Sequence, residues 1–464
     1  MNTECRDRAR VRRLSKGGLA WMLGAIGAAG FLVGGEAGCF RPPPVRVAET
    51  ALRTPQTAPV LAWIAKHAIQ DDLYANFTGR TGDLFDGAWV IGLGEATHGQ
   101  SDTFQFKRAQ TMHAVEQQGC RVVAYESSAA RAIACDDYIA GRSNNLAAAM
   151  KGFGMLIWQV EENARFLDDL RRWNSTAAPA DRVRFIGIDI QDPQAAIARL
   201  REVIPAANVG LIDAAAALAQ RADAAAQAMM SGNPQPMDAL KADLDQWGAS
   251  VEAVEGLSDS AAARRSLCRM EIQAGLTMAS SVGARDRAMA SMLLAQMQGV
   301  DASHPMMLWA HNAHVMHAPL RYMGEAGEGE LAMGGHLREA LGNRYIAVGA
   351  AFGRGSFNAL DRYGEQWDFR TYKVGEPRPD SLEAMLSGVT ARSYVLDLRG
   401  YLDLAHVSPR VREWLDSGHG QRWFGGYNVS IDESLPLLPT FPRKDFDVLY
   451  YNHESRPTTP FGKK

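Results

Sequence analysis

Cysteine is scarce in this sequence, and the cysteines that do occur follow no metal-binding or redox spacing. Five cysteines are present in 464 residues, and no Cys-x-x-Cys pair is found, which excludes a zinc ribbon. Two of the five lie in an unusual N-terminal segment, so Cys120, Cys135 and Cys268 are left and permit at most one disulfide. We expect these three cysteines to be structural.

Other signatures of function are also missing. Positive charge is not in excess, because 49 Lys and Arg stand against 52 Asp and Glu, for a formal net charge of -3; this argues against a nucleic-acid partner. Neither a Gly-x-Ser-x-Gly elbow nor a His-Glu-x-x-His motif occurs. A serine triad of the common hydrolase type and a zincin site are therefore unsupported. The sequence also has no internal repeat and no long heptad pattern.

The N-terminal segment has the pattern of an export signal. Basic residues at 6–16 precede an uncharged apolar run at 17–35, as in a secretory signal peptide. Ala37-Gly38-Cys39 then resembles a bacterial lipobox, although Glu36 stands where that pattern has an aliphatic residue. We expect export to the periplasm or cell envelope, and three fates of the segment stay open: simple cleavage, lipid anchoring through Cys39, or retention of the apolar run as an uncleaved membrane anchor. Residues 1–39 thus form a signal or anchor.

The rest of the chain is organised as one elaborated domain. A Pro-rich spacer at 40–50 leads into a domain at 51–453, and a polar tail at 454–464 is expected to be solvated. Apolar runs predict strands at 88–93, 121–126, 182–190, 304–311, 345–352, 393–398 and 446–451.

Stretches with helical spacing alternate with the first of these strands, at 103–118, 129–140 and 158–173. Such alternation predicts an α/β fold with a parallel-rich central sheet flanked by helices. From about 195 to 297 strand signals vanish, and we expect an all-helical insertion of three or four helices that covers a site. For the C-terminal part, the sequence predicts irregular α+β structure.

Ionisable residues stand where four of the predicted strands end. These residues are Glu95 with His98, Glu126, Asp189, and His311 with His314. Because the carboxyl ends of parallel strands converge on one crevice, we expect the two glutamates and these three histidines to share a site. An isolated Glu-x-x-His is more often a helix cap beside a loop histidine, and it is the repetition in four strands that argues for a site. Asp189 and His317 are secondary candidates for this site, and Asp189 also fits a role in ordering the loop at 191–193.

The predicted cluster suits hydrolysis by activated water. An imidazole held by carboxylates can take a proton from water near neutral pH, and two histidines opposite it can stabilise an oxyanion and protonate a leaving alkoxide. The same side chains would equally ligate a divalent metal. Two alternatives therefore stay open at this point. One is a metal-dependent hydrolase, and the other is a non-catalytic envelope lipoprotein that binds haem or a metal ion through its histidines.

The segment Gly92-x-Gly94-Glu95-Ala96-Thr97-His98-Gly99, followed by Val123-Ala124-Tyr125-Glu126, resembles the signature of the erythromycin esterase family. The resemblance continues at 158–174, 185–189, 284–289, 309–314 and 333–337, and so covers most of residues 85–450. It implies hydrolysis of a macrolactone ester, as in erythromycin and other macrolides, by water and without an acyl-enzyme or a required metal. Antibiotic resistance would be the biological outcome.

The resemblance also implies roles for individual residues. His98 would be the general base, Glu95 and Glu126 the essential carboxylates, and His311 and His314 the two later histidines of the site. Lys107 and Arg108, with Asp189, would bind substrate, although a solvated helix face explains Lys107 and Arg108 equally well. The resistance esterases resemble cytosolic enzymes, whereas this chain carries an export signal, and some relatives are named for exopolysaccharide biosynthesis. A related lactone or ester is thus a second candidate substrate.

Overall fold

The computed structural model describes most of the chain beyond the N-terminal segment. The described residues are 44–51, 53–70, 82–233, 236–277, 283–297, 300–321, 329–363, 366–399, 407–427, 429–431 and 437–462. They belong to one compact unit that spans residues 43–464. The expected signal, the lipobox and the start of the spacer lie outside the described residues. Within the described part, no helix combines the length and apolar character needed to cross a bilayer.

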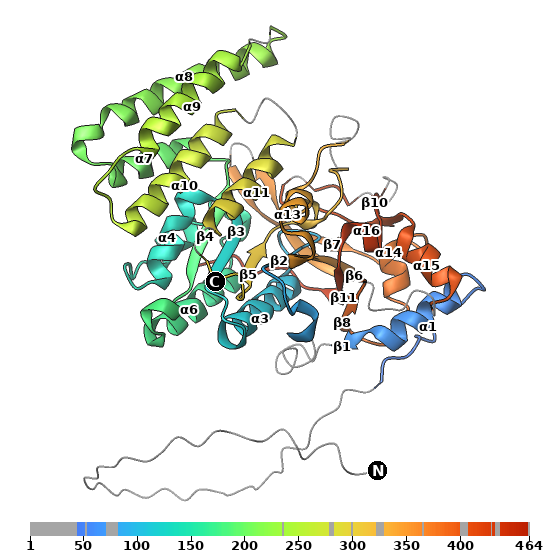
Figure 1. Ribbon diagram of the computed structural model, residues 1–464. Coiled ribbons are helices and arrows are strands. Elements are labelled where there is room, and N and C mark those ends of the chain that lie inside the picture. Colours follow the sequence, from blue (N-terminus) through green and yellow to red (C-terminus); the bar gives the residue numbers. More distant parts are fainter. Residues whose placement is uncertain are drawn as a thin grey trace, which may run out of the picture. The chain divides into compact units, whose positions relative to one another are not determined.

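A nine-stranded mixed sheet forms the centre of this unit (Figure 1). Its strand order is β1 (Ile69–Gln70), β8 (Ser393–Asp397), β11 (Val448–Ser455), β6 (Tyr345–Tyr363), β2 (Val90–Leu93), β5 (Met306–Trp309), β3 (Val122–Ser128) and β4 (Arg184–Asp189), and β7 (Gln366–Val374) pairs with β6. All pairings from β11 across to β4 are parallel, whereas β1, β7 and β8 run antiparallel to their neighbours. The predicted α/β class with a parallel-rich sheet is confirmed.

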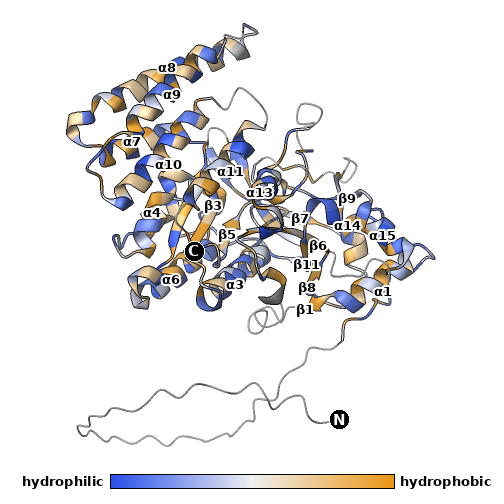
Figure 2. Ribbon diagram, in the orientation of Figure 1, coloured by the Kyte–Doolittle hydropathy of each residue, from blue (hydrophilic) through white to orange (hydrophobic). Residues whose placement is uncertain are grey.

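The central strands are buried along their whole length, as expected of parallel strands covered on both faces. Every residue of β2, β3 and β5 is buried, and the strands carry hydrophobic colour in Figure 2. In register, Leu93 of β2 pairs with Trp309 of β5, and Trp309 pairs with Tyr125 of β3. These three positions are therefore level with one another, which brings the residues that come directly after them to one edge of the sheet.

Helices cover both faces of the sheet. One face packs against α3 (Ser101–Gln117), α4 (Ala129–Ile139) and α6 (Glu161–Thr176). The other packs against α1 (Thr57–His67), α11 (Ala284–Gln296), α13 (Met333–Leu341), α14 (Leu382–Leu386) and α15 (Pro409–Asp416). Shorter elements are α5 (Leu146–Lys151), α12 (Asn312–Val315), α16 (Pro442–Asp445) and the pair β9 (His419–Gln421) with β10 (Leu438–Thr440). Cys120, Cys135 and Cys268 are buried, and within the described residues none of them forms a disulfide.

Within the described residues, the helical insertion contains one helix more than the largest number predicted. Its five helices are α7 (Pro193–Val203), α8 (Gly210–Met230), α9 (Asp238–Glu252), α10 (Asp259–Gly275) and α11. The extra break comes at Pro205, because proline lacks the N–H that would continue the helix. Helices α7 to α10 share a core of their own with α4, whereas α11 packs into the core of the main sheet. Figure 1 shows α7 to α10 together beside α4.

The C-terminal part is more regular than predicted. The strand expected at 345–352 continues to Tyr363, and residues 366–374, expected to be irregular, form its hairpin partner. The glycines and polar residues after Phe352 conceal this extension, because they break the apolar pattern. The expected solvated tail is packed instead: Ser455 and Thr458 are buried, and the Thr458 N–H donates to the Gly99 carbonyl at 3.0 Å. The tail thus covers the turn that follows β2.

Candidate active site

The turn after β2 positions the first part of the site. Gly94 is required there, because a Cβ atom at this position would lie 2.3 Å from the Asn312 side-chain oxygen and 2.7 Å from the Val348 carbonyl. The backbone N–H of Asn312, which follows β5, donates to the Glu95 carbonyl at 2.9 Å. The turns after β2 and β5 are thereby joined, and Glu95, His98 and His311 are held together.

Glu95, His98 and Lys107 form a buried chain of hydrogen bonds. The His98 Nδ1–H donates to Glu95 Oε1 at 2.6 Å, and the Lys107 Nζ donates to Glu95 Oε2 at 2.6 Å. Burial alone would raise the pKa of Glu95, but Lys107 and then His98 outweigh it and lower that pKa. An ionised Glu95 only accepts hydrogen bonds, so it fixes the proton of His98 on Nδ1. Nε2 of His98 is left as the ring nitrogen that can accept a proton.

His311 presents a donor beside His98. The Ala313 backbone N–H donates to Nδ1 of His311 at 3.2 Å, which places the ring proton on Nε2. This Nε2 is buried and has no hydrogen-bond partner among the described residues. Burial, and then the proximity of His98, lower the pKa of His311 to about 3, so the ring is neutral at pH 7. The rings of His98 and His311 are 5.2 Å apart, centroid to centroid.

A second buried network surrounds Glu126 at the end of β3. Glu126 Oε2 accepts the backbone N–H of His311 at 2.8 Å, and Oε1 accepts from the Arg285 guanidinium at 2.9 Å. Arg285 also donates to both oxygens of Asp189, at 3.0 and 2.8 Å. Asp189 and Glu126 are thus tied together across the ends of β3 and β4.

His314 lies in this second network. Its Nδ1 is 2.8 Å from Asp286 Oδ1, and its Nε2 is 3.3 Å from Glu126 Oε1 and 3.0 Å from the Arg285 guanidinium. Burial alone would lower the pKa of His314, but Asp286 and Glu126 raise it to about 10. Burial alone would raise the pKa of Glu126, but His314 and Arg285 hold it well below its usual value. His311 and His314, which lie in one turn, therefore differ at neutral pH: His311 is neutral and His314 is protonated.

A cavity of about 310 Å³ opens between the two networks. Its lining is His98, Glu126, Met155, Gln191, Arg285, His311, Ala313, His314, Trp423, Gly425, Tyr427 and Leu438. Aromatic edges fix the imidazoles: the ring of Trp158 is 5.2 Å from that of His98, and the ring of Trp423 is 6.0 Å from that of His311. The cavity thus combines a base, neutral and charged donors, and an apolar wall.

The loop from Trp423 to Tyr427 closes one side of the cavity. The Phe424 N–H donates to the Ala96 carbonyl at 2.8 Å, and the Leu360 N–H of β6 donates to the Gly426 carbonyl at 2.8 Å. A Cβ atom at Gly426 would lie 2.9 Å from the His98 ring, so the loop passes directly over the imidazole. This contact limits how far the ring of His98 can tilt.

Most of the residues expected to share a site lie together, and two do not. Glu95, His98, Glu126, Asp189, His311 and His314 surround or support the cavity, and Lys107 joins them through Glu95. Arg108 instead forms an ion pair with Asp169 on the partly exposed side of α3 and does not line this cavity. His317 pairs with Asp447 at 2.8 Å on another part of the sheet edge.

Sequence reasoning missed Arg285, Asp286 and the residues of the Trp423 loop. Arg285 and Asp286 open helix α11, which the sequence pattern assigned to the insertion, and only the resemblance at 284–289 pointed to them. Trp423 and Tyr427 come from a region without regular periodicity. Their partners are fixed by tertiary contacts, which no local pattern encodes.

The carboxylates of the site form ion pairs with neighbouring basic side chains. Within the described residues, no group of three or more His, Cys, Asp and Glu side chains is arranged to hold a metal ion. Glu95 pairs with Lys107 and His98, and Glu126 and Asp189 share Arg285. The donor set therefore suits proton transfer better than coordination.

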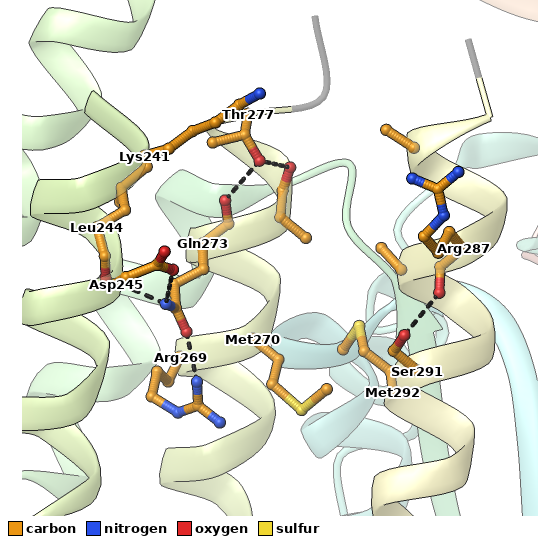
Figure 3. A pocket seen from close by; sticks show the side chains of 13 residues that line it. Lys241, Leu244, Asp245, Arg269, Met270, Gln273, Thr277, Arg287, Ser291 and Met292 are labelled. Carbon is orange, nitrogen blue, oxygen red and sulfur yellow. Dashed lines mark hydrogen bonds between the residues drawn. The ribbon is translucent and has the colours of Figure 1, made fainter. Parts of the chain in front are cut away.

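A different cavity, of about 460 Å³, lies between α9, α10 and α11. Figure 3 shows Arg287, Ser291 and Met292 of α11 there, opposite Met270 and Gln273 of α10. Helix α11 thus has two distinct faces, one directed toward the strand ends and one toward its helical neighbours.

Comparison with known proteins gives a consistent result. The family model described as erythromycin esterase matches residues 115–455. An erythromycin esterase type II from Escherichia coli is 30% identical over 116 residues, and this segment covers 24% of the chain and only 27% of that relative. The match therefore spans about a quarter of either protein.

Solved structures share the fold. A succinoglycan biosynthesis protein is 17% identical with a TM-score of 0.70, covering 87% of this chain and 98% of its own. A Bacillus cereus protein is 18% identical with a TM-score of 0.69, covering 87% and 99%. A histidine-to-asparagine mutant of erythromycin esterase EreC, in its open conformation, is 16% identical with a TM-score of 0.57, covering 82% and 93%. At such low sequence identity, these matches show only that the fold is shared. The family model matches well over half of the chain, and this match shows that the chain belongs to the erythromycin esterase family.

Proposed function

We propose that this protein is a carboxylic ester hydrolase in which His98 activates a water molecule that attacks the ester directly. The observation that carries the proposal is the pairing of two ring nitrogens at the cavity. Glu95 holds the proton of His98 on Nδ1 and leaves Nε2 as an acceptor, while His311 offers an unpartnered Nε2–H. An acceptor for the proton of water next to a donor for an oxyanion is what ester hydrolysis needs.

The reaction follows from these positions. Nε2 of His98 takes a proton from water, and the water oxygen bonds to the carbonyl carbon of the ester. The negative charge that develops on the carbonyl oxygen is stabilised by the Nε2–H of His311. Collapse of this intermediate breaks the bond to the alkoxide, which receives a proton from an imidazolium of the site. The products are the acid and the alcohol, with no bond to the protein.

The substrate that we propose is a macrolactone such as erythromycin, or a related lactone or ester. The family and the Escherichia coli relative support the first choice. The cavity has room for about ten water molecules, so a macrolactone would extend beyond it. Tyr427 lines the cavity and contacts Trp367 at 5.1 Å, centroid to centroid, and both rings are partly exposed. The part of the substrate outside the cavity would lie against these two rings.

The proposal is tested with the full-length chain and a panel of macrolides and simpler alkyl lactones. Mass spectrometry would detect the addition of one water to a substrate. We expect hydrolysis of at least one ester, unaffected by chelator, and a rate that falls by ~10²- to 10⁴-fold in His98→Gln. His304→Gln is the matched control, because His304 lies at the opposite end of β5 and is half exposed. Unchanged hydrolysis by His98→Gln would contradict the mechanism.

We further propose that the protein acts outside the cytoplasm. The basis is the sequence of residues 6–39, with its basic start, apolar run and lipobox-like cysteine. Fractionation of cells that make the full chain should find it in the envelope. Recovery in the cytoplasmic fraction at its full mass would contradict export.

A further inference from the structure

Asp286 and Arg285 enter the site from the helical insertion. Arg285 and Asp286 are the second and third residues of helix α11. Their side chains nevertheless contact Glu126 of β3, Asp189 at the end of β4 and His314 after β5. We propose that Asp286 and Arg285 are positioning residues, which hold His314 as the acid that protonates the leaving oxygen. This inference rests on the proposed ester hydrolysis and adds the source of the second proton transfer.

The contacts of Asp286 place its carboxylate where it can orient the imidazole of His314. Asp286 is buried, with 2% of its side chain exposed, and its Oδ1 accepts the Met333 N–H from the start of α13 at 2.8 Å. The same oxygen lies 2.8 Å from Nδ1 of His314. A carboxylate fixed in this way directs the Nδ1–H of His314 toward itself, and it turns Nε2 toward the cavity side, where Glu126 and Arg285 lie.

Arg285 fixes the other neighbour of His314. Its guanidinium spans from Asp189 to Glu126, and the second oxygen of Glu126 accepts the backbone N–H of His311. The chain of contacts therefore runs from α11 through the ends of β4 and β3 to the turn that carries both later histidines. A displacement of Arg285 would be transmitted to that turn.

The two halves of the site follow one plan. His98 and His314 each have Nδ1 held by a carboxylate, Glu95 in one case and Asp286 in the other, and each carboxylate has a second donor, Lys107 or the Met333 N–H. Each imidazole is therefore held through Nδ1 by a buried carboxylate, which leaves Nε2 as the ring nitrogen that can exchange a proton.

Titratable groups from α11, β3 and its own turn surround His314. Asp286 and Arg285 reach it from α11, Glu126 from β3, and His311 precedes it in its own turn. The acidic neighbours raise the pKa of His314 to about 10, which keeps it protonated at neutral pH. Loss of the Asp286 charge should lower that pKa.

The test compares two kinds of ester in Asp286→Asn. An alkyl lactone needs protonation of its leaving alkoxide, whereas p-nitrophenyl acetate releases a phenolate that needs none. We expect kcat for the lactone to fall by ~10²- to 10⁴-fold, and the basic limb of its pH profile to move to lower pH. The rate with p-nitrophenyl acetate should change by less than about 10-fold. Arg287→Gln is the matched control, because Arg287 lies on the face of the same helix that lines the cavity beside α10 (Figure 3). Arg287 also forms an exposed ion pair with Glu330.

The outcomes separate the two proposals. Equal losses on both esters without a shift of the basic limb, in a variant with an unchanged thermal midpoint, would overturn the role of Asp286. If Asp286→Asn unfolds, Asp286→Glu, which keeps the charge but displaces the oxygen, should show the same selective loss on the lactone. Full activity of His98→Gln on both esters would instead refute the proposed function and leave the positioning contacts as a structural feature.

Discussion

Lys107 is a lysine whose charged side chain is buried in the protein rather than exposed to water. It is 1% exposed, and burial lowers its pKa while Glu95 opposes that effect. Its Nζ donates to Glu95 and also to the Ala310 carbonyl at 3.3 Å. The ammonium therefore balances the charge of Glu95 and ties α3 to the end of β5. A buried cation in this position keeps Glu95 ionised for His98.

Replacement of Lys107 by Met should affect stability and pH dependence together. Removal of one partner from a buried ion pair costs ~3–5 kcal/mol, which denaturant unfolding would measure. Because the pKa of Glu95 is lowered in the folded chain, its stabilising effect is present above the unfolded value and is lost as pH falls through the folded one. In Lys107→Met the pKa of Glu95 should rise. The pH at which Glu95 stops stabilising the fold, and the acid limb of the kcat profile, should therefore both move to higher pH.

Arg108→Met provides the comparison for that experiment. Arg108 is the next residue of α3, but it forms a partly exposed ion pair with Asp169, and such pairs contribute ~0–1 kcal/mol. If Arg108→Met lowered the free energy of unfolding as much as Lys107→Met, the burial of Lys107 would not explain its contribution to stability.

At the residue scale, the strand-end residues were predictable and their orienting partners were not. Glu95, His98, Glu126 and His311 directly follow apolar runs, so a local pattern places them at one sheet edge. Arg285 lies 159 positions from its partner Glu126. A contact over that separation depends on how α11 packs, and nothing in the sequence near position 285 specifies it.

At the element scale, the hairpin of β6 and β7 is the part of the fold that extends the site. Trp367 of β7 pairs with Arg362 in register, and Tyr363 pairs with Gln366. Because side chains alternate along a strand, Trp367 and Tyr363 point to opposite faces of the hairpin. Only the Trp367 face contacts Tyr427 at the cavity.

Trp367→Ala should therefore distinguish large esters from small ones. We expect a several-fold higher KM for a macrolide, with kcat little changed, because contact area is lost outside the reacting centre. Kinetics with a small alkyl lactone should be unaffected. Tyr363→Ala removes an exposed aromatic ring of similar size from the other face and should leave both substrates unchanged. An equal effect of Trp367→Ala on the two substrates would argue against an outer contact at this ring.

The sequence predicted the parallel strands well because each is a buried apolar run, and it predicted the helical breaks at 232 and 256 from glycine. It did not predict β7, whose alternating polar residues pair with a twisted extension of β6 rather than with the core. Nor did it predict the packed tail, because Thr458 is held by the Gly99 backbone and not by apolar burial.

At the scale of the whole molecule, the site joins parts of the chain that are far apart in sequence. The turns after strands of the main sheet carry the proposed base His98 and the proposed oxyanion donor His311. Helix α11 of the insertion supplies Arg285 and Asp286, and the C-terminal residues cover the turn of His98. The catalytic cavity should therefore depend on the integrity of the whole unit at 43–464. A truncation after 453 would remove the cover over that turn.

The most direct test of the central claim follows the first turnover with p-nitrophenyl acetate. If water activated by His98 attacks the ester itself, p-nitrophenol release should be linear from the start, without a burst. Intact-mass measurement should find no acetylated protein, and the release should be lost in His98→Gln. A burst equal to the protein concentration, with an added acetyl group on the chain, would show an acyl-enzyme and contradict direct attack by water.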